Sequence, residues 1–187
     1  MSVVSADIVA IGAGIAGATA AAHLAPHRRV ALIEAEESAG YHTTGRSAAL
    51  WLQNYGPPDV RLLSRLGRPF FESPPAGFAS VPLMRRRPVL FVATEAQLPD
   101  LEATLAEGMG LRRLPTDQAE AMVPALKPGY LASAAIEDDA FDMDVAAIHQ
   151  GFLRRLRDCG GTLALRHRAG RIERVGSMWR VETTTGD

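Results

Sequence analysis

The chain has 187 residues, of which 47% are hydrophobic and 22% charged, as is ordinary for a globular protein with a sizeable core. The formal net charge is −1 and the basic residues form no long tract, so nothing indicates a nucleic-acid partner. The single cysteine, Cys159, excludes an internal disulfide and a thiolate-based metal cluster. No stretch reaches the ~20 apolar residues of a membrane-spanning helix, and no signal peptide precedes the first predicted strand. We therefore expect a cytoplasmic protein without a transmembrane segment, with one domain or one and a half.

The first elements follow a strand, turn, helix and strand pattern. Residues 8–11 are apolar and predict a strand, and Gly12-Ala13-Gly14-Ile15-Ala16-Gly17 predicts a tight turn that opens a helix over 15–25. A second apolar strand, 30–33, ends on Glu34. This is the G-x-G-x-x-G fingerprint in its full context, which favours a site for an adenine dinucleotide over a glycine turn without a ligand.

Each part of this fingerprint has a physical role. Gly12 permits a tight exit from the strand, the missing Cβ of Gly14 lets a pyrophosphate approach the backbone, and Gly17 lets the helix lie against the sheet. The free N–H groups and the positive dipole end of the helix favour a phosphate charge. Glu34 can accept hydrogen bonds from a ribose diol and would repel the 2′-phosphate of NADP. The fingerprint alone does not distinguish FAD from NAD.

The middle of the chain changes in character. Residues 35–45 predict a loop, 46–52 a short helix or extended segment, and 59–72 a helix that Pro69 should kink or end. The later predicted elements are one or two strands within 81–94 with an exposed edge at 85–87, a helix at 98–108, a short helix at 116–123 with Thr116 as its N-cap, a strand at 130–136 and a polar loop at 137–143.

The last part returns to alternating helix and strand. Asp144 predicts the N-cap of a helix that stops at Gly160, followed by a strand at 162–165 and a hairpin formed by 171–175 and 178–183. The order of elements indicates an α/β fold, in which a parallel-sheet nucleotide-binding domain is interrupted by a middle segment of about 50–142.

No metal site is expected. The acids between 137 and 144 lack the glycine and terminal glutamate of a calcium loop. His23 and His149 are interpreted as packing or surface residues of their helices. The histidines are scattered without the paired spacing of a metal site: His23, His27, His42, His149 and His167.

A second motif, Gly40-Tyr41-His42-Thr43-Thr44-Gly45-Arg46-Ser47-Ala48-Ala49, follows the fingerprint. With the fingerprint and Glu34, it resembles the D-amino acid oxidase–like flavoproteins, most closely the bacterial FAD-dependent D-arginine and D-amino acid dehydrogenases. The resemblance continues through 55–56, 70–71, 74–78 and 147–154, so it covers most of the chain.

This resemblance implies a Rossmann-like FAD-binding domain, with a parallel sheet, helices and a β-hairpin, from residues 1–49 and 143–187. Part of an α+β substrate domain, 50–142, would interrupt it. FAD rather than NAD would be the cofactor. The residues that bind it would contact its adenosine ribose, its pyrophosphate or its flavin. Arg46 could instead be a solvated surface arginine. The implied cofactor-binding residues are Gly12, Gly14, Ile15, Ala16, Gly17, Glu34, Ala35, Thr43, Thr44, Arg46, Ser47, Ala48 and Ala169.

The implied chemistry is that of the flavin: the Cα hydrogen of a D-amino acid leaves as hydride to flavin N5, and the imino acid hydrolyses to a keto acid. The amine must be neutral, so the rate should rise with pH. No acid–base residue of this stretch is required, and the catalytic residues stay unknown. Oxygen or a quinone could reoxidise the flavin.

Two residues depart from the D-arginine dehydrogenase pattern. Leu50 stands where that pattern has a histidine near the flavin, a ring that Ser47 would also face by the resemblance. Val89 stands where the pattern has an acid that pairs with a cationic side chain. Tyr55 matches a tyrosine of the substrate pocket. Because an unpaired guanidinium facing Val89 is costly to bury, we expect a D-amino acid or related amine with a small or apolar side chain.

Relatives of this kind are about twice as long, and their later half supplies further strands, a second glycine segment and an arginine for the substrate carboxylate. We therefore expect this chain to be an N-terminal half with an incomplete FAD site, inactive by itself. Two alternatives stay open. One is a non-catalytic dinucleotide-binding module, which the apolar Leu50 and Val89 favour. The other is a flavoenzyme for another amine or a hydroxy acid, similar to glycine or sarcosine oxidase.

Overall fold

The computed structural model describes residues 4–185, which fall into two compact units. The first unit lies within the segments Met1–Ala48, Pro74–Leu83 and Asp144–Asp187, and the second comprises Ala49–Ser73 and Met84–Met143.

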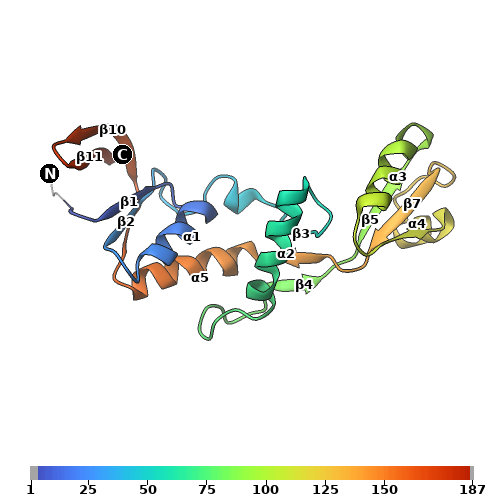
Figure 1. The fold of residues 1–187 in the computed structure, drawn as a ribbon, viewed down its shortest axis with the longest axis horizontal. Helices are drawn as coiled ribbons and strands as arrows, with labels where there is room; N and C mark the ends of the chain where they lie inside the picture. Colours follow the sequence, from blue (N-terminus) through green and yellow to red (C-terminus); the bar gives the residue numbers. More distant parts are fainter. Residues whose placement is uncertain (1–3, 186–187) are drawn as a thin grey trace. The chain divides into compact units, whose positions relative to one another are not determined.

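The first unit is built on a parallel sheet with the strand order β1-β2-β9 (Figure 1). In its register Ile8 lies opposite Val30, and Ala31 lies opposite Thr162. Two helices connect the strands in the β-α-β manner, so the predicted α/β class with a parallel sheet is confirmed. The elements are β1 (Ile8–Ile11), α1 (Ile15–Leu24), β2 (Val30–Ile33), α5 (Val145–Asp158) and β9 (Thr162–Ala164).

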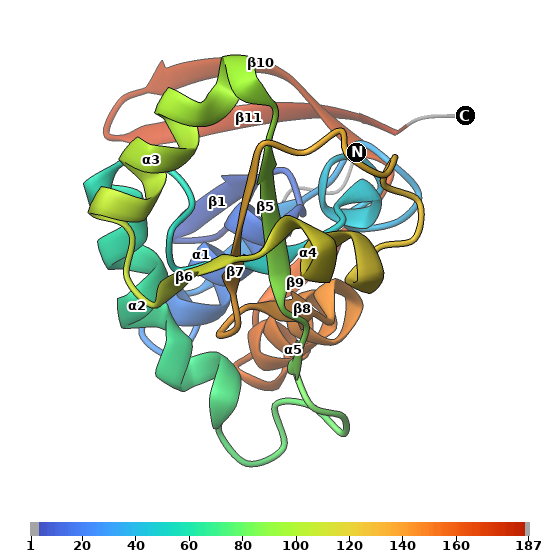
Figure 2. The same ribbon diagram turned by 90° about the vertical axis from the view of Figure 1, so that its right-hand side faces the viewer.

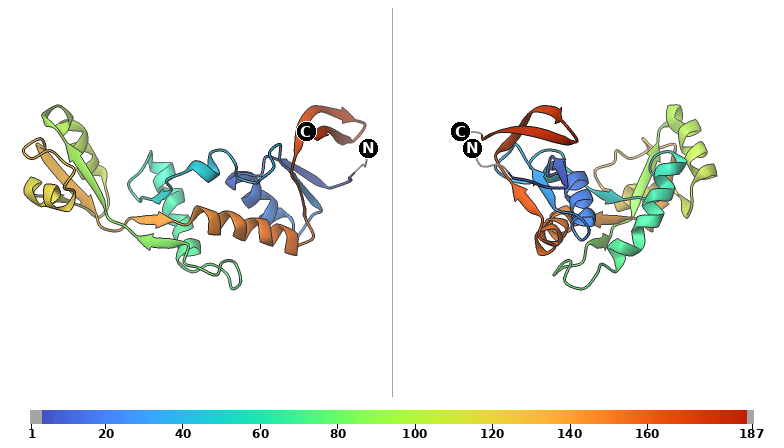
Figure 3. Two further views of the ribbon diagram at one scale, coloured as in Figure 1. Left: turned by 180° about the vertical axis from the view of Figure 1, so that it is seen from behind. Right: turned by 60° about the vertical axis from the view of Figure 1, so that its left-hand side comes forward.

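Helices α1 and α5 pack side by side on one face of this sheet, and the hairpin of β10 (His167–Val175) and β11 (Met178–Thr185) lies on the other (Figures 1 and 3). The face of α1 that is buried is made of alanines, which lets α5 approach closely. The central strand β2 has neighbours on both sides, and all four of its residues are buried.

The segment Pro74–Leu83 belongs to the first unit, although the sequence placed it in the interruption at 50–142. Phe78 is buried and meets Phe152 of α5 edge-to-face, with ring centroids 5.0 Å apart. Gly151 makes room for this ring, since a Cβ there would lie 2.5 Å from it. The Phe78 carbonyl also accepts a hydrogen bond from the Arg154 guanidinium. These contacts attach the segment to α5.

The second unit centres on an antiparallel sheet with the order β5-β7-β6 (Figure 2). Alternate residues of β7 face opposite sides: Ala134 and Ile136 pack in a cluster with Ala119 of α4, and Ala135 packs with Leu101 of α3. The two helices therefore cover opposite faces of the sheet. The elements are β5 (Val89–Ala93), α3 (Leu98–Glu107), β6 (Leu111–Leu114), α4 (Thr116–Met122) and β7 (Ser133–Glu137).

A smaller antiparallel sheet of the same unit has the order β3-β8-β4. The remaining elements are β3 (Leu50–Trp51), α2 (Pro58–Glu72), β4 (Met84–Arg86), β8 (Phe141–Met143) and the 3₁₀ turns η1 (Thr44–Arg46) and η2 (Glu95–Gln97).

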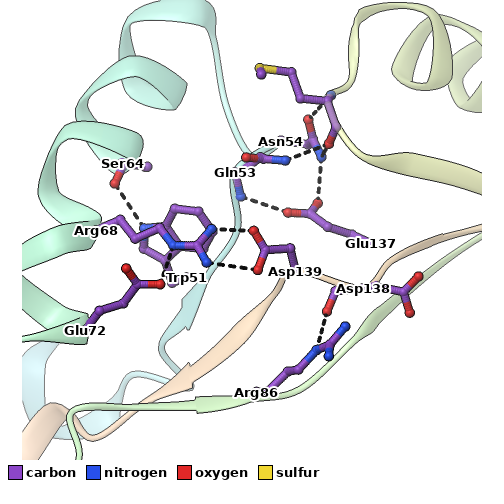
Figure 4. Close-up of polar contacts among 11 residues, drawn as sticks. Trp51, Gln53, Asn54, Ser64, Arg68, Glu72, Arg86, Glu137, Asp138 and Asp139 are labelled. Carbon is purple, nitrogen blue, oxygen red and sulfur yellow. Dashed lines mark hydrogen bonds and ion pairs between the residues drawn. The ribbon is translucent and has the colours of Figure 1, made fainter.

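Arg68 joins α2 to this small sheet (Figure 4). Its guanidinium carbon lies 4.9 Å from the Trp51 ring centroid and 5.1 Å from that of Phe141. It forms ion pairs with Glu72 and Asp139. Hydrogen bonding to the guanidinium lowers the pKa of Asp139 below its ordinary value.

Several local predictions are wrong. Strand β6 was missed, and β8 occupies part of the predicted polar loop because Phe141–Met143 pairs with both β3 and β4. Helix α4 has Pro115 rather than Thr116 as its N-cap, and the Glu120 carboxylate accepts from the Gly129 N–H.

Helix α2 does not end at Pro69. It continues to Glu72, and the Ser73 N–H donates to the Pro69 carbonyl, so the last turn keeps its hydrogen bonding beyond the proline.

The N-cap of α5 gives a direct stability test. The Asp144 carboxylate accepts from the Ala147 N–H at 2.8 Å, and Asp144→Ala should lower the free energy of unfolding in urea by about 1 kcal/mol. Asp158→Ala at the opposite end is the control, because an acid there opposes the helix dipole. Equal losses in both variants would contradict the capping role.

Candidate functional site

The glycine turn between β1 and α1 has a conformation that requires its glycines. Gly12 has φ of +94°, a left-handed value that favours glycine. A Cβ on Gly17 would lie 1.9 Å from the Gly12 carbonyl oxygen, so only glycine permits this approach of the helix to the turn. The Gly12 N–H donates to the Ile33 carbonyl at 2.8 Å, which ties the turn to β2.

Glu34, at the tip of β2, reaches back to this turn. One carboxylate oxygen accepts from the Ala13 N–H at 2.7 Å and the other from the Glu36 N–H at 3.1 Å. The side chain is partly exposed. A carboxylate offers about four acceptor positions, so the group can hold the turn and still accept hydrogen bonds from a ligand.

The second motif meets the first at the N-terminus of α1. The Thr44 hydroxyl oxygen accepts from the Ile15 N–H at 2.9 Å, a contact across 29 residues. A Cβ on Gly14 would lie only 3.2 Å from the Thr44 hydroxyl oxygen, so this oxygen is also close to Gly14. The Thr44 proton remains available to a ligand oxygen. Two of the predicted cofactor segments are thus brought together at a helix N-terminus, where anions bind favourably.

A backbone hydrogen bond closes the loop that carries Thr44. Gly40 has φ of +78°, and its carbonyl accepts from the Gly45 N–H at 2.7 Å. The side chains of Thr43, Arg46, Ser47 and Ala48 are exposed, and the Arg46 guanidinium carbon lies 5.4 Å from the Tyr41 ring centroid.

The start of β10 lies beside Glu34. The His167 N–H donates to the Glu34 carbonyl at 2.7 Å, and the Arg166 N–H donates to the Glu36 carbonyl at 3.0 Å. Ala169 is partly buried two residues further along β10, and Ala35 is partly buried directly after Glu34.

His149 of α5 is a member of this constellation that the sequence reasoning missed. It is 4% exposed, and its Nε2 lies 2.8 Å from the Ala13 carbonyl oxygen. The sequence interpretation as a packing or surface residue accounts for its burial but not for this polar contact. A signal was present, because 147–154 belongs to the segments that carry the family resemblance.

The predicted substrate residues Leu50, Tyr55 and Val89 lie in the second unit. Tyr55 is 72% exposed and Leu50 41% exposed, while Val89 is partly buried and pairs with Glu137 across the β5–β7 ladder. Within residues 4–185, no group of histidines, cysteines or acids is arranged to hold a metal ion. No helix in that part of the chain is long and apolar enough to cross a membrane.

A buried carboxylate, Glu137, which the sequence analysis placed in a polar loop, fixes the residues before Tyr55 (Figure 4). Glu137 is fully buried and accepts from the Gln53 N–H at 2.8 Å and from the Asn54 side-chain amide at 2.9 Å. The Asn54 amide also exchanges two hydrogen bonds with the backbone of Met109. The Glu137 carboxylate therefore has a structural role in holding this loop.

A model of the FAD dependent oxidoreductase family, DAO, matches residues 7–187, so the chain belongs to this family.

Several solved structures share this fold. L-α-glycerophosphate oxidase from Mycoplasma pneumoniae, with FAD bound, superposes with a TM-score of 0.82 at 14% identity over 98% of this chain and 51% of that chain. Glycine oxidase from Geobacillus kaustophilus gives 0.82 at 20% identity over 97% and 52%. L-amino acid deaminase from Proteus vulgaris gives 0.77 at 17% identity over 100% and 46%. The chain thus spans about half the length of each of these proteins.

The cofactor prediction, FAD rather than NAD, is confirmed by the family. The residues in place fit such a cofactor: the Gly17 position leaves no room for a Cβ, Glu34 keeps free acceptor positions, and Thr44 keeps a free proton beside the helix N-terminus. The D-arginine dehydrogenase subtype does not follow from the family match.

Gly17→Ala tests the glycine turn. The added Cβ must displace the Gly12 carbonyl, so the variant should lose about 3 kcal/mol of unfolding free energy and bind FAD much more weakly. Gly170→Ala is the matched control in the same unit, because its Cβ would meet nothing closer than 3.6 Å. Unchanged flavin binding by Gly17→Ala, measured by fluorescence titration, would contradict the role of this contact.

Glu137→Ala tests the buried carboxylate. Removing the acceptor leaves the Gln53 N–H and the Asn54 amide without their bonds, which should cost about 3 kcal/mol of unfolding free energy. Asp138→Ala, which removes only an exposed ion pair with Arg112, should cost less than about 1 kcal/mol. A Glu137→Ala variant as stable as Asp138→Ala in urea would refute this account.

Proposed function

We propose that this chain is part of a FAD-dependent oxidoreductase that oxidises an amino acid or a related amine at Cα. The observation that carries the proposal is the convergence of Glu34, the Gly12–Gly17 turn and Thr44 at the N-terminus of α1. Here the first unit is the FAD-binding domain and the second is part of the substrate domain. The 187 residues supply one half of the enzyme.

Each segment of the first unit takes one part of the cofactor. Glu34 and Ala35 hold the adenosine ribose, with Ala169 facing the adenine. The turn from Gly12 to Gly17, including Ile15 and Ala16, holds the pyrophosphate. The support for this assignment is electrostatic: backbone N–H groups and a helix dipole suit the diphosphate, and a carboxylate suits a diol.

The loop after Thr43 serves the remaining length of the cofactor. Thr43, Thr44, Arg46, Ser47 and Ala48 offer hydroxyl, guanidinium and backbone donors to phosphate and flavin oxygens. The side chains of Thr43, Arg46 and Ser47 are exposed, and the partly buried Thr44 keeps its hydroxyl proton while its oxygen accepts from the Ile15 N–H. Ser47 would approach the flavin ring.

FAD, when bound, supplies the hydride acceptor. The chain's own residues bind the cofactor, orient it and shape the substrate space. Leu50 and Val89 contribute apolar surface, and Tyr55 contributes a hydroxyl at an exposed position. No proton transfer is assigned to a side chain of this stretch, and the substrate amine must be neutral when its Cα hydrogen leaves.

The substrate class follows from these apolar replacements. A cationic side chain facing Val89 would have no partner there, because the cross-strand Glu137 carboxylate is committed to Gln53 and Asn54. We therefore propose a D-amino acid or related amine with a small or apolar side chain. Glycine oxidase and L-amino acid deaminase share the fold, so glycine, sarcosine and L-amino acids belong in the same screen.

Anaerobic bleaching of the flavin in the full-length protein tests the reaction. D-Amino acids with small side chains should bleach the absorbance, with rates that rise with pH, and reoxidation by oxygen or by a quinone then identifies the acceptor. D-Arginine as the best substrate would refute the proposed specificity. Bleaching only by hydroxy acids or glycerol 3-phosphate would reject the proposed amine substrate and indicate that the substrate is an alcohol.

A second candidate is a non-catalytic dinucleotide-binding module. It is favoured by the loss of polar groups at Leu50 and Val89. Bound FAD that no amine or hydroxy acid bleaches would support the module and reject the enzyme.

The ribose contact gives a quantitative prediction. Glu34→Ala removes a charged acceptor from the diol and frees the Ala13 N–H, so the FAD dissociation constant should rise about 10- to 100-fold. Glu37→Ala is the control, because this exposed acid pairs with Arg166 instead of the turn. Equal affinities of the two variants in a fluorescence titration would contradict the assignment of Glu34.

A further inference from the structure

Within residues 4–185, His149 is the one histidine with a buried side chain, and it connects three segments that are distant in sequence. It lies on α5, its Nε2 is 2.8 Å from the carbonyl oxygen of Ala13, and its ring lies against Gly40. A Cβ on Gly40 would be 2.9 Å from the His149 Cε1 atom, so the loop passes over the ring as closely as a glycine allows.

The direction of the hydrogen bond is determined by its partner. A carbonyl oxygen only accepts, so Nε2 must carry the proton. Ala13 is itself fully buried, and a buried carbonyl without a donor is costly. The imidazole is therefore the donor that allows the Ala13 carbonyl to point into the protein.

This contact also determines where an N–H group points. In a planar trans peptide, the C=O and the following N–H point in opposite directions. Because His149 holds the Ala13 carbonyl toward α5, the Gly14 N–H is directed away from α5. The Ala13 N–H is held separately by the Glu34 carboxylate at 2.7 Å. Both peptide groups of Ala13 are thus fixed, one by Glu34 and one by His149.

We propose that His149 is a positioning residue of the FAD site, which rests on the proposed function of the first unit. It presets the orientation of the Ala13–Gly14 peptide for the pyrophosphate and supports the Gly40 loop that delivers Thr44. Without the donor, the empty turn rotates the Ala13 carbonyl toward water, and the cofactor must reverse that rotation when it binds.

The test compares three variants of the full-length protein by FAD titration and by thermal unfolding of the apoprotein. His149→Phe keeps a ring but has no donor. His149→Gln places an amide Nε2 the same number of bonds from Cβ and can restore the bond. Leu156→Ala is the packing control: this fully buried residue of the same helix packs against Gly161, away from the turn.

His149→Phe should raise the FAD dissociation constant about tenfold or more, and His149→Gln should return it to within about threefold of the wild type. Leu156→Ala should lower the melting temperature but leave the dissociation constant within about threefold. The inference is overturned if His149→Phe binds FAD like the wild type, if Gln and Phe are equally impaired, or if Leu156→Ala weakens binding as much as Phe. A wild-type protein that binds no FAD overturns the proposed function together with this inference.

Discussion

The contact between Gly17 and the Gly12 carbonyl is the constraint on which the rest of the first unit depends. A Cβ at Gly17 would lie 1.9 Å from that oxygen, so the start of α1 can approach the turn only if residue 17 is glycine. This approach brings the helix N-terminus to the end of β1 and leaves the Ala13 peptide between Glu34 and His149. The Ile15 N–H then meets Thr44, which brings in the second loop. One steric condition thus links the turn, the acid, the helix and the loop.

The parts of this arrangement whose residues are close together in the chain could be predicted from the amino-acid sequence. Strand, turn, helix and strand from Ile8 to Ile33 follow from apolar runs and glycine spacing, and the Asp144 N-cap follows from residue type. The position of Glu34 beside the turn could be predicted because the residue directly follows the second strand, whereas its role toward a ribose stays a prediction. FAD itself came from a longer motif, 40–49, and the family match agrees with it.

The parts that depend on distant partners could not be predicted in this way. Phe141–Met143 becomes a strand because it lies between β3 and β4, although it is only three residues long and is flanked by acidic residues. Glu137 is buried because Gln53 and Asn54, more than 80 residues away, supply its donors. His149 is separated from Ala13 by 136 residues. Residue type and helical spacing carry no information on such partners, so a buried histidine with a polar role could not be distinguished from a packed one.

In the proposed arrangement, the first unit holds the adenosine diphosphate part of a flavin dinucleotide. Titration of the full-length apoprotein with FAD and with FMN tests it directly, because FMN has the same isoalloxazine ring but lacks the adenosine monophosphate that Glu34 and the glycine turn would hold. Tight binding of FAD, with FMN bound at least about a hundredfold more weakly, is the predicted result. Equal binding of FMN and FAD would contradict the claim.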